Sequence, residues 1–248
     1  GSREMMNAVT NLKWVEATDY DEMSKIAAGI FVEQLKGNSQ TVFGMATGST
    51  PEGFYKELVS IYKEGNISFA QAKSFNLDEY IGINPSNEAS YHYYMDHNLF
   101  NHIDMKQENI YLPTGNAANI EKAAMDYDAM IEEAGNIDIQ LLGIGVNGHI
   151  GFNEPGTPFD LGTNVIELAE STREANKIYF DSINDVPTHA ITMGIKTIMK
   201  SKKIVLLIAG AAKQEAFDRL RSGEVTEDFP ASVLNYHPDV TVIYTGVE

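Results

Sequence analysis

The chain has 248 residues, no cysteine, and 35 acidic against 18 basic residues, which gives a net charge of −17. The missing cysteines exclude disulfides and thiolate chemistry. The hydrophobic residues, 43% of the chain, form no apolar run near twenty residues, so no membrane span is expected. The negative charge repels phosphate backbones and acidic lipids, so neither nucleic acid nor a membrane is an expected partner.

One domain is expected. The length suits a single α/β domain with a full core, and no linker or internal repeat divides the chain. We expect residues 6–248 to form this domain and residues 1–5 to be terminal residues outside it, because Gly1-Ser2 resembles the remnant of a protease cleavage. No charged leader with a hydrophobic region precedes the first polar segment, which favours a cytoplasmic enzyme.

Predicted strands and helices alternate along the chain. Apolar residues at three-to-four spacing, with stop signals at their ends, predict helices over residues 20–36, 54–61, 90–102, 119–133 and 213–221. Short apolar runs predict strands over residues 41–46, 73–77, 109–112, 138–144, 165–168, 189–193, 203–209 and 240–244. This alternation predicts a three-layer α/β sandwich, with a mainly parallel, Rossmann-like sheet and helices on both faces.

The first candidate site is a loop of small polar residues, Thr47-Gly48-Ser49-Thr50, between a predicted strand and a helix that begins near Pro51. Free amides and hydroxyls at the positive end of a helix dipole can bind an anion. The loop is not a Walker loop, because no Gly-Lys-Ser/Thr sequence ends it. A capped turn without a ligand is the other explanation of this pattern.

Acidic residues follow the strand predicted over residues 73–77. Asp78 stands at its carboxyl end, where open α/β sheets have their ligand-binding crevice, although a carboxylate that bonds loop amides would give the same pattern. The helix predicted over residues 90–102 carries His92, His97 and His102. A spacing of five does not put them on one helical face, so no metal cluster is expected there.

A glycine-rich loop follows the strand predicted over residues 138–144. Its glycines are Gly143, Gly145, Gly148, Gly151 and Gly156. Such a loop permits tight turns and close backbone approach. His149 and Glu154 lie within it and form a titratable pair at a strand end, which indicates a site. A histidine that only bonds neighbouring carbonyls is the alternative.

Five separated segments together resemble the glucosamine-6-phosphate deaminase family, in the same order. They are residues 41–51, 76–80, 143–156, 186–187 and 230–232. The Phe-Asn-Glu-Pro sequence that includes Glu154 is unlike the related 6-phosphogluconolactonases. The resemblance implies conversion of glucosamine 6-phosphate and water to fructose 6-phosphate and ammonia, without a metal or an organic cofactor.

The resemblance also implies a role for each matching residue. Asp78 would move the proton during isomerisation, His149 would open the sugar ring, and Glu154 would hold the imidazole. Asn147 stands where better-known members have Asp, so it can orient the ring but adds no negative charge. The substrate phosphate would bind to Thr47, Gly48, Ser49, Thr50 and Lys213.

The chain departs from the family at one phosphate ligand. Ile178 stands at the position that we align with an arginine of the family. Either Lys177 or Arg173 supplies the missing positive charge, or the affinity for the phosphate is poor, or the natural substrate is a different amino-sugar phosphate. Gly162 and Asn164 stand in the stretch where members activated by N-acetylglucosamine 6-phosphate have basic residues, so that activation is not expected.

Two other functions stay open at this point. The same chemistry could act on another hexosamine phosphate, such as galactosamine 6-phosphate, because contacts to the C4 hydroxyl decide this preference. Ile178 and Asn147 would also fit a regulator that binds sugar phosphates without turnover. A homo-oligomer stays open too, because the family that the chain resembles includes both hexamers and monomers.

Overall fold

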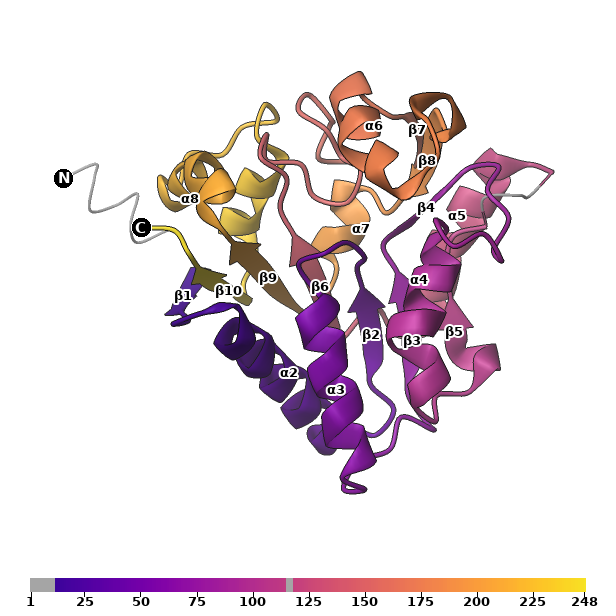
Figure 1. The fold of residues 1–248 in the computed structure, drawn as a ribbon, viewed down its shortest axis with the longest axis vertical. Helices are drawn as coiled ribbons and strands as arrows, with labels where there is room; N and C mark the ends of the chain where they lie inside the picture. The colour runs from indigo at the N-terminus through magenta and orange to yellow at the C-terminus, as the bar shows by residue number, and fades with distance from the viewer. Residues whose placement is uncertain (1–11, 115–117) are drawn as a thin grey trace.

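The structure is a computed structural model that describes residues 12–114 and 118–248, so the expectation for residues 1–5 lies outside it. Seven strands form one sheet with parallel pairings throughout, in the order β1-β10-β9-β6-β2-β3-β5 (Figure 1). They are β1 (Leu12–Glu16), β2 (Val42–Met45), β3 (Lys73–Asn76), β5 (Ile110–Tyr111), β6 (Ile139–Gly143), β9 (Lys203–Ala209) and β10 (Val240–Thr245). The expected mainly parallel sheet is confirmed.

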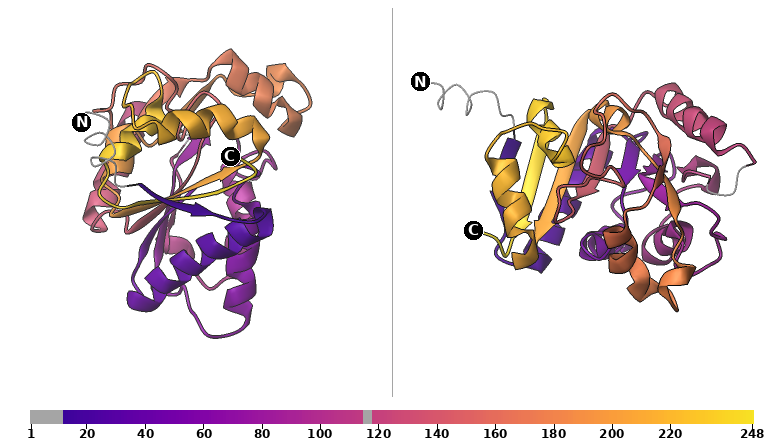
Figure 2. Two further views of the ribbon diagram at one scale, coloured as in Figure 1. Left: turned by 90° about the vertical axis from the view of Figure 1, so that its left-hand side faces the viewer. Right: turned by 90° about the horizontal axis from the view of Figure 1, so that it is seen from above.

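Helices cover both faces of this sheet, as expected for a three-layer sandwich. The helices of the described residues are α2 (Tyr20–Gly37), α3 (Glu52–Lys63), α4 (Tyr91–Asn98), α5 (Ile120–Glu133), α6 (Glu170–Asn176), α7 (Ile195–Met199) and α8 (Gln214–Arg221), of which α6 lies beside the second sheet (Figure 1). Figure 2 shows α2 and α3 on one side of the sheet and α8 on the other. α2 begins where the Asp19 carboxylate accepts a hydrogen bond of 2.8 Å from the Glu22 amide, which satisfies a donor of the first turn.

A second sheet of three antiparallel strands lies beyond the carboxyl ends of the parallel strands (Figure 1). Its strands are β4 (Asp78–Tyr80), β8 (His189–Thr192) and β7 (Asn164–Glu167). Leu77 joins the two sheets: its amide donates to the Met45 carbonyl at 2.9 Å, and its carbonyl accepts from the Met193 amide at 2.8 Å. The chain thus passes from β3 directly into β4, which places Asp78 at the junction of the two sheets.

Several elements differ from the sequence-based expectation. β1 was not predicted, because it is an edge strand whose residues are at most half-buried and show no clear alternation. β4 was read as a loop, since its three residues form a strand only by pairing with the distant β8. The unpredicted β1 pairs with β10, so the last strand of the chain is an inner strand of the sheet. The helix expected over residues 90–102 ends at Asn98, and a 3-10 turn (Phe100–His102) follows it.

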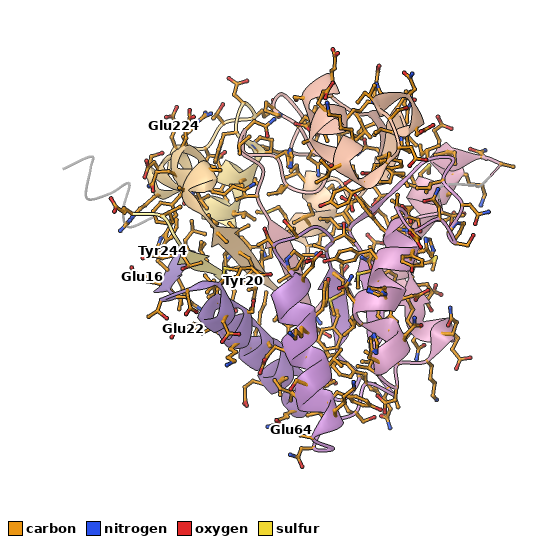
Figure 3. The ribbon with its side chains drawn as sticks, in the orientation of Figure 1. Glu16, Tyr20, Glu22, Glu64, Glu224 and Tyr244 are labelled. Carbon is orange, nitrogen blue, oxygen red and sulfur yellow. The ribbon has the colours of Figure 1, made fainter. Side chains whose placement is uncertain are left out.

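The core lies between these layers, and the negative charge lies outside them. Residues 204–208 of β9 are at most 2% exposed, in agreement with the apolar run that predicted this strand. Figure 3 shows Glu16, Glu64 and Glu224 at the rim of the molecule. No helix in the described part of the chain is long and apolar enough to cross a bilayer. The buried apolar residues form a large main cluster and a small second one around Tyr80 and Phe152, and the site must be sought where polar groups turn inward.

Candidate active site

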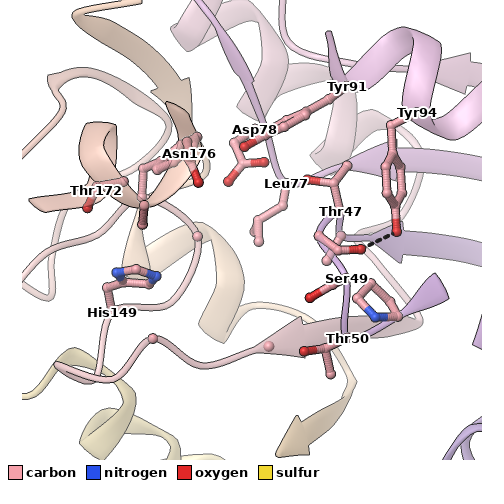
Figure 4. A pocket seen from close by; sticks show the side chains of 18 of the residues that line it. Thr47, Ser49, Thr50, Leu77, Asp78, Tyr91, Tyr94, His149, Thr172 and Asn176 are labelled. Carbon is pink, nitrogen blue, oxygen red and sulfur yellow. Dashed lines mark hydrogen bonds between the residues drawn. The ribbon is translucent and has the colours of Figure 1, made fainter. Parts of the chain in front are cut away.

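A cavity of about 520 Å³ opens at the carboxyl ends of the central strands, between the two sheets. This size is typical of small-molecule sites. Its lining comes from the loops after β2 and β6, the start of β4, and helices α4 and α6 (Figure 4). Of the residues singled out from the sequence, the lining contains Thr47, Gly48, Ser49, Thr50, Asp78, Asn147, His149 and Lys213. Segments up to 166 positions apart in the sequence thus meet around one cavity.

Asp78 is a buried carboxyl group with unused hydrogen-bonding capacity. It is 6% exposed, and its side chain points into the pocket in Figure 4. No described residue donates a hydrogen bond to its carboxyl oxygens. Burial raises the pKa of Asp78 to about 8, and the negative charge of Glu79 adds to the effect. A carboxyl group that titrates near the working pH can both take and return a proton.

His149 lies across the pocket and contacts a second carboxylate. Its Nδ1 is 3.4 Å from Glu154 Oε1, a distance typical of an ion pair without a well-formed hydrogen bond. The His149 amide donates to Asn147 Oδ1 at 3.1 Å, which fixes the loop around the imidazole. A Cβ on Gly145 would come within 2.6 Å of the imidazole ring, so only glycine leaves room for the ring there. The glycine spacing of this loop therefore has a steric cause at the site itself.

Glu154 does not line the cavity but holds residues that do. Asn147 Nδ2 donates to its Oε2 at 2.9 Å, and Thr172 Oγ1 donates to its Oε1 at 2.7 Å. Burial alone would raise the pKa of Glu154, but His149, Thr172 and Asn147 outweigh burial and lower the pKa to about 2. Glu154 is therefore a carboxylate at neutral pH, and it places a negative charge 3.4 Å from His149 Nδ1.

The 47–50 loop and Lys213 form a positively polarised end of the cavity. Gly48 has φ = +111°, in the left-handed region that favours glycine. None of the four amides of residues 47–50 donates a hydrogen bond to another described residue. Lys213 is the one Lys or Arg among the described residues of the lining, and its Nζ donates to the Ile144 carbonyl at 2.6 Å. Burial lowers the pKa of Lys213.

The structure does not bring Arg173 and Lys177 to the cavity, contrary to expectation. Arg173 Nη2 donates to the carbonyls of Ile183 and Val186 at 3.0 and 3.1 Å. Lys177 forms an exposed ion pair of 2.7 Å with Glu174. The reason is helical phase: α6 and the following turn present Ser171, Thr172, Ala175, Asn176 and Tyr179 to the cavity, so positions 173 and 177 face away.

Ile178, the residue that aligns with the family arginine, is also placed away from the lining. It is 75% exposed on the 3-10 turn Lys177–Tyr179. Its neighbour Tyr179, 56% exposed, does line the cavity. In this arrangement no guanidinium from the described part of the chain reaches the pocket, and Lys213 is left to carry the positive charge.

Several lining residues were not identified from the sequence as parts of a site. They are Tyr80, Tyr91, Tyr94, Thr172, Asn176 and Tyr179. Tyr91 and Tyr94 were assigned to the inner face of a helix, and their spacing gave no sign that this face borders a cavity. Asn176 Nδ2 donates to Tyr80 Oη at 2.9 Å across 96 residues of sequence, a contact with no local signal. Tyr80 is the third residue of the Asp-Glu-Tyr sequence that begins at Asp78, and this was the one local indication that it belongs to the site.

The site offers acid–base groups and an anion cradle in one cavity. Within the described residues, no group of three or more His, Asp or Glu side chains could hold a metal ion. The chemistry that the present groups support is proton transfer by Asp78 and His149 on a small molecule whose anionic group lies against the 47–50 loop and Lys213.

Comparisons with known proteins agree with one another. Residues 18–243 match the family model described as glucosamine-6-phosphate isomerases/6-phosphogluconolactonase. The chain is similar to the glucosamine-6-phosphate deaminase of Lysinibacillus sphaericus, with 57% identity over 95% of this chain and 99% of the relative. It is also similar to that of Shouchella clausii, with 53% identity over 92% and 93% of the two chains.

Solved structures give the same result for the fold. A structure described as a monomeric glucosamine-6-phosphate deaminase superposes with a TM-score of 0.92 and 48% identity, over 94% of this chain and 97% of that chain. The 6-phosphogluconolactonase of Thermotoga maritima superposes with a TM-score of 0.75 at 19% identity, over 95% and 99% of the two chains. That second likeness shows a shared fold alone.

Proposed function

We propose a division of roles among the pocket residues of this chain, which belongs to the glucosamine-6-phosphate isomerase/6-phosphogluconolactonase family. The chain is an enzyme that converts glucosamine 6-phosphate and water to fructose 6-phosphate and ammonia, as its relatives at 57% and 53% identity are named. The observation that supports the residue roles is the convergence of Asp78, His149, Lys213 and the 47–50 loop on one cavity.

His149 opens the sugar ring in this proposal. The imidazole takes the proton of the anomeric hydroxyl and delivers a proton to the ring oxygen, so the C1 to ring-oxygen bond breaks and an aldehyde forms. Glu154 holds the ring from the Nδ1 side, at 3.4 Å, and favours the imidazolium that exists between the two proton transfers. Asn147 positions both, through the His149 amide and the Glu154 carboxylate.

Asp78 then moves a proton between two neighbouring carbons. As a carboxylate it removes the proton from C2 of the open-chain aldehyde, and a proton of the substrate's ammonium group passes to the aldehyde oxygen to give an enol-amine. Asp78 then returns the C2 proton to C1. The amine is then an iminium at C2, water adds to this carbon, and ammonia leaves to give the ketone. The absence of a hydrogen-bond donor on Asp78 among the described residues suits this role, since such donors would lower its basicity.

The phosphate binds at the opposite end of the cavity. The free amides of the 47–50 loop, the hydroxyls of Thr47, Ser49 and Thr50, and the Lys213 ammonium surround the space where it would lie. The N-terminus of α3 points at the same place and adds its dipole. These groups replace the guanidinium that Ile178 cannot supply.

Ammonia release from glucosamine 6-phosphate, with galactosamine 6-phosphate as the parallel substrate, tests the proposal. We expect release from glucosamine 6-phosphate and at most slow release from its C4 epimer. Faster release from galactosamine 6-phosphate would reassign the substrate. No release from either, together with thermal stabilisation by the sugar phosphate, would indicate a binding protein without turnover.

The compartment and the oligomeric state are parts of the proposal too. We infer that the enzyme acts in the cytoplasm, where sugar phosphates are found. A homo-oligomer was left open from the sequence, whereas the solved relative at 48% identity is described as monomeric. Light scattering on the purified chain distinguishes the two states by mass.

A further inference from the structure

Three tyrosine hydroxyls, each from a different helix, bind the carbonyls of the 47–50 loop and of the residue before it. Tyr94 Oη on α4 donates to the Gly48 carbonyl at 2.6 Å (Figure 4). Tyr20 Oη on α2 donates to the Thr50 carbonyl at 2.8 Å, with the Ser49 carbonyl at 3.2 Å. Tyr55 Oη on α3 donates to the carbonyl of Ala46 and accepts from its amide at 3.2 Å.

These contacts fix which way the peptide groups of the loop face. A carbonyl that is held by a hydroxyl has a fixed direction, and the N–H of the same peptide group points the opposite way, so the direction of the next residue's amide is fixed too. The four amides of residues 47–50 make no hydrogen bond to another described residue, which agrees with donors that are kept for a ligand. If the carbonyls were free to rotate toward the cavity, their partial negative charge would repel a phosphate.

Tyr20 also connects the loop to the first turn of α3. Its hydroxyl accepts a hydrogen bond of 2.9 Å from the Gly53 amide. A Cβ on Gly53 would lie 2.7 Å from Tyr20 Cε2, so glycine is needed for the ring to approach this closely. One tyrosine therefore couples the loop and the helix N-terminus, the two groups of donors that face the phosphate.

Two of these hydroxyls, those of Tyr55 and Tyr94, lie in buried surroundings that favour their protonated form. Burial raises the pKa of the Tyr55 and Tyr94 hydroxyls above the ordinary value for tyrosine. The Tyr94 ring packs edge-on against Tyr55, with centroids 6.1 Å apart. The two hydroxyls are thus held as neutral donors by the same packed aromatic pair.

We propose that Tyr20 and Tyr94 are positioning residues for phosphate binding: by holding the carbonyls of Gly48, Ser49 and Thr50, they aim the loop amides at the substrate. The inference rests on the proposed function, in which the substrate carries its phosphate at this loop. This chain depends on such positioning, because Lys213 is the one Lys or Arg in the described lining and Arg173 is bound to carbonyls elsewhere.

The test uses Tyr20→Phe, Tyr94→Phe and the double variant, which remove the hydroxyls and keep the rings. Inorganic phosphate is the probe, with its Kd measured by calorimetry, and KM and kcat are measured with glucosamine 6-phosphate. Each single variant is expected to weaken phosphate binding and raise KM by about three- to tenfold, as the loss of one positioning hydrogen bond predicts. The double variant is expected to show a larger increase, with kcat within about twofold of the unchanged enzyme.

Tyr236→Phe is the matched control. Tyr236 is 65% exposed and its hydroxyl makes no hydrogen bond to another described residue, so its variant is expected to leave Kd, KM and melting temperature unchanged. The inference is overturned if Kd and KM of the double variant match those of the control, if kcat falls while KM stays constant, or if the unchanged enzyme does not bind phosphate. Phosphate binding is measured without turnover, so an enzyme that binds phosphate through the tyrosines but releases no ammonia would refute the proposed function alone.

Discussion

The start of β4 and the glycine-rich loop after β6 each supply one carboxyl group: Asp78 lines the cavity, and Glu154 contacts residues that line it. The two groups have opposite properties. Burial raises the pKa of Asp78 to about 8, with no described donor to offset it. The hydrogen bonds from Thr172 and Asn147, together with the nearby His149, outweigh burial at Glu154 and lower its pKa to about 2. Asp78 is the more deeply buried of the two and has no such partners, which in the proposed mechanism suits it to move protons while Glu154 holds a fixed charge.

Asp78→Asn should give the largest effect. We expect it to lower kcat by at least about a thousandfold, because the amide cannot take the C2 proton. The melting temperature should stay the same or rise, since a buried carboxyl group without partners stabilises nothing. Activity assays and differential scanning calorimetry check both expectations. A variant that keeps activity, or that unfolds well below the unchanged enzyme, would mark Asp78 as a structural residue.

Glu154→Gln should give the next largest effect and sharpen the contrast. The amide can keep one contact to Thr172 or Asn147 but removes the charge beside His149. We expect kcat to fall by about ten- to a hundredfold, in the range found for residues that orient a catalytic group. Glu154→Asp, which keeps the charge but shortens the reach, serves as the comparison. Equal activity of Glu154→Gln and the unchanged enzyme would remove the proposed role for the charge.

The two carboxyl groups should also affect stability at different pH. The folded-state pKa of Asp78 lies above its ordinary value of 3.8, so the folded state binds the extra proton and the unfolding free energy falls as pH rises from 3.8 to about 8. The pKa of Glu154 lies below 4.5, so its contribution is present above that pH and is lost as pH falls toward 2.

Melting curves of Asp78→Asn and the unchanged enzyme at several pH values measure the first of these effects. The melting temperature of the variant relative to the unchanged enzyme should increase between pH 4 and pH 8. A constant difference over this range would show that the pKa of Asp78 is the same in the folded and unfolded chain.

Changes on the outer side of the 3-10 turn that follows α6 should have the smallest effect. Lys177 points away from the cavity and pairs with Glu174, so Lys177→Ala should leave KM within about twofold. Ile178→Arg is the informative second substitution, because the side chain at this position is exposed next to Tyr179 of the lining. An added guanidinium that reaches the phosphate would lower KM several-fold. A rise in KM for Lys177→Ala would show that this segment turns inward when substrate binds.

The sequence predicted the sheet and several of the residues that line the cavity because both have local signals. The apolar run of β9 and the glycine-rich loop around His149 and Glu154 are contiguous in the chain. Asp78 was predicted from its place at a strand end, although its own strand β4 was not, because that strand depends on pairing with β8.

Long-range geometry limited the rest. The helical phase of α6 could not be fixed from seven residues, so Arg173 was expected at the phosphate although it binds the carbonyls of Ile183 and Val186. The tyrosines around the 47–50 loop come from three helices, and no local pattern indicates which carbonyl each hydroxyl would reach.

The dependence of kcat/KM on pH tests most directly the claim that Asp78 is the group that moves protons and Glu154 the fixed charge. We predict that kcat/KM of the unchanged enzyme rises with a midpoint near pH 8, as Asp78 becomes a carboxylate, and that Glu154→Gln keeps this midpoint at lower activity. A midpoint near pH 4, or one that moves with the Glu154 substitution while Asp78 is intact, would contradict the assignment.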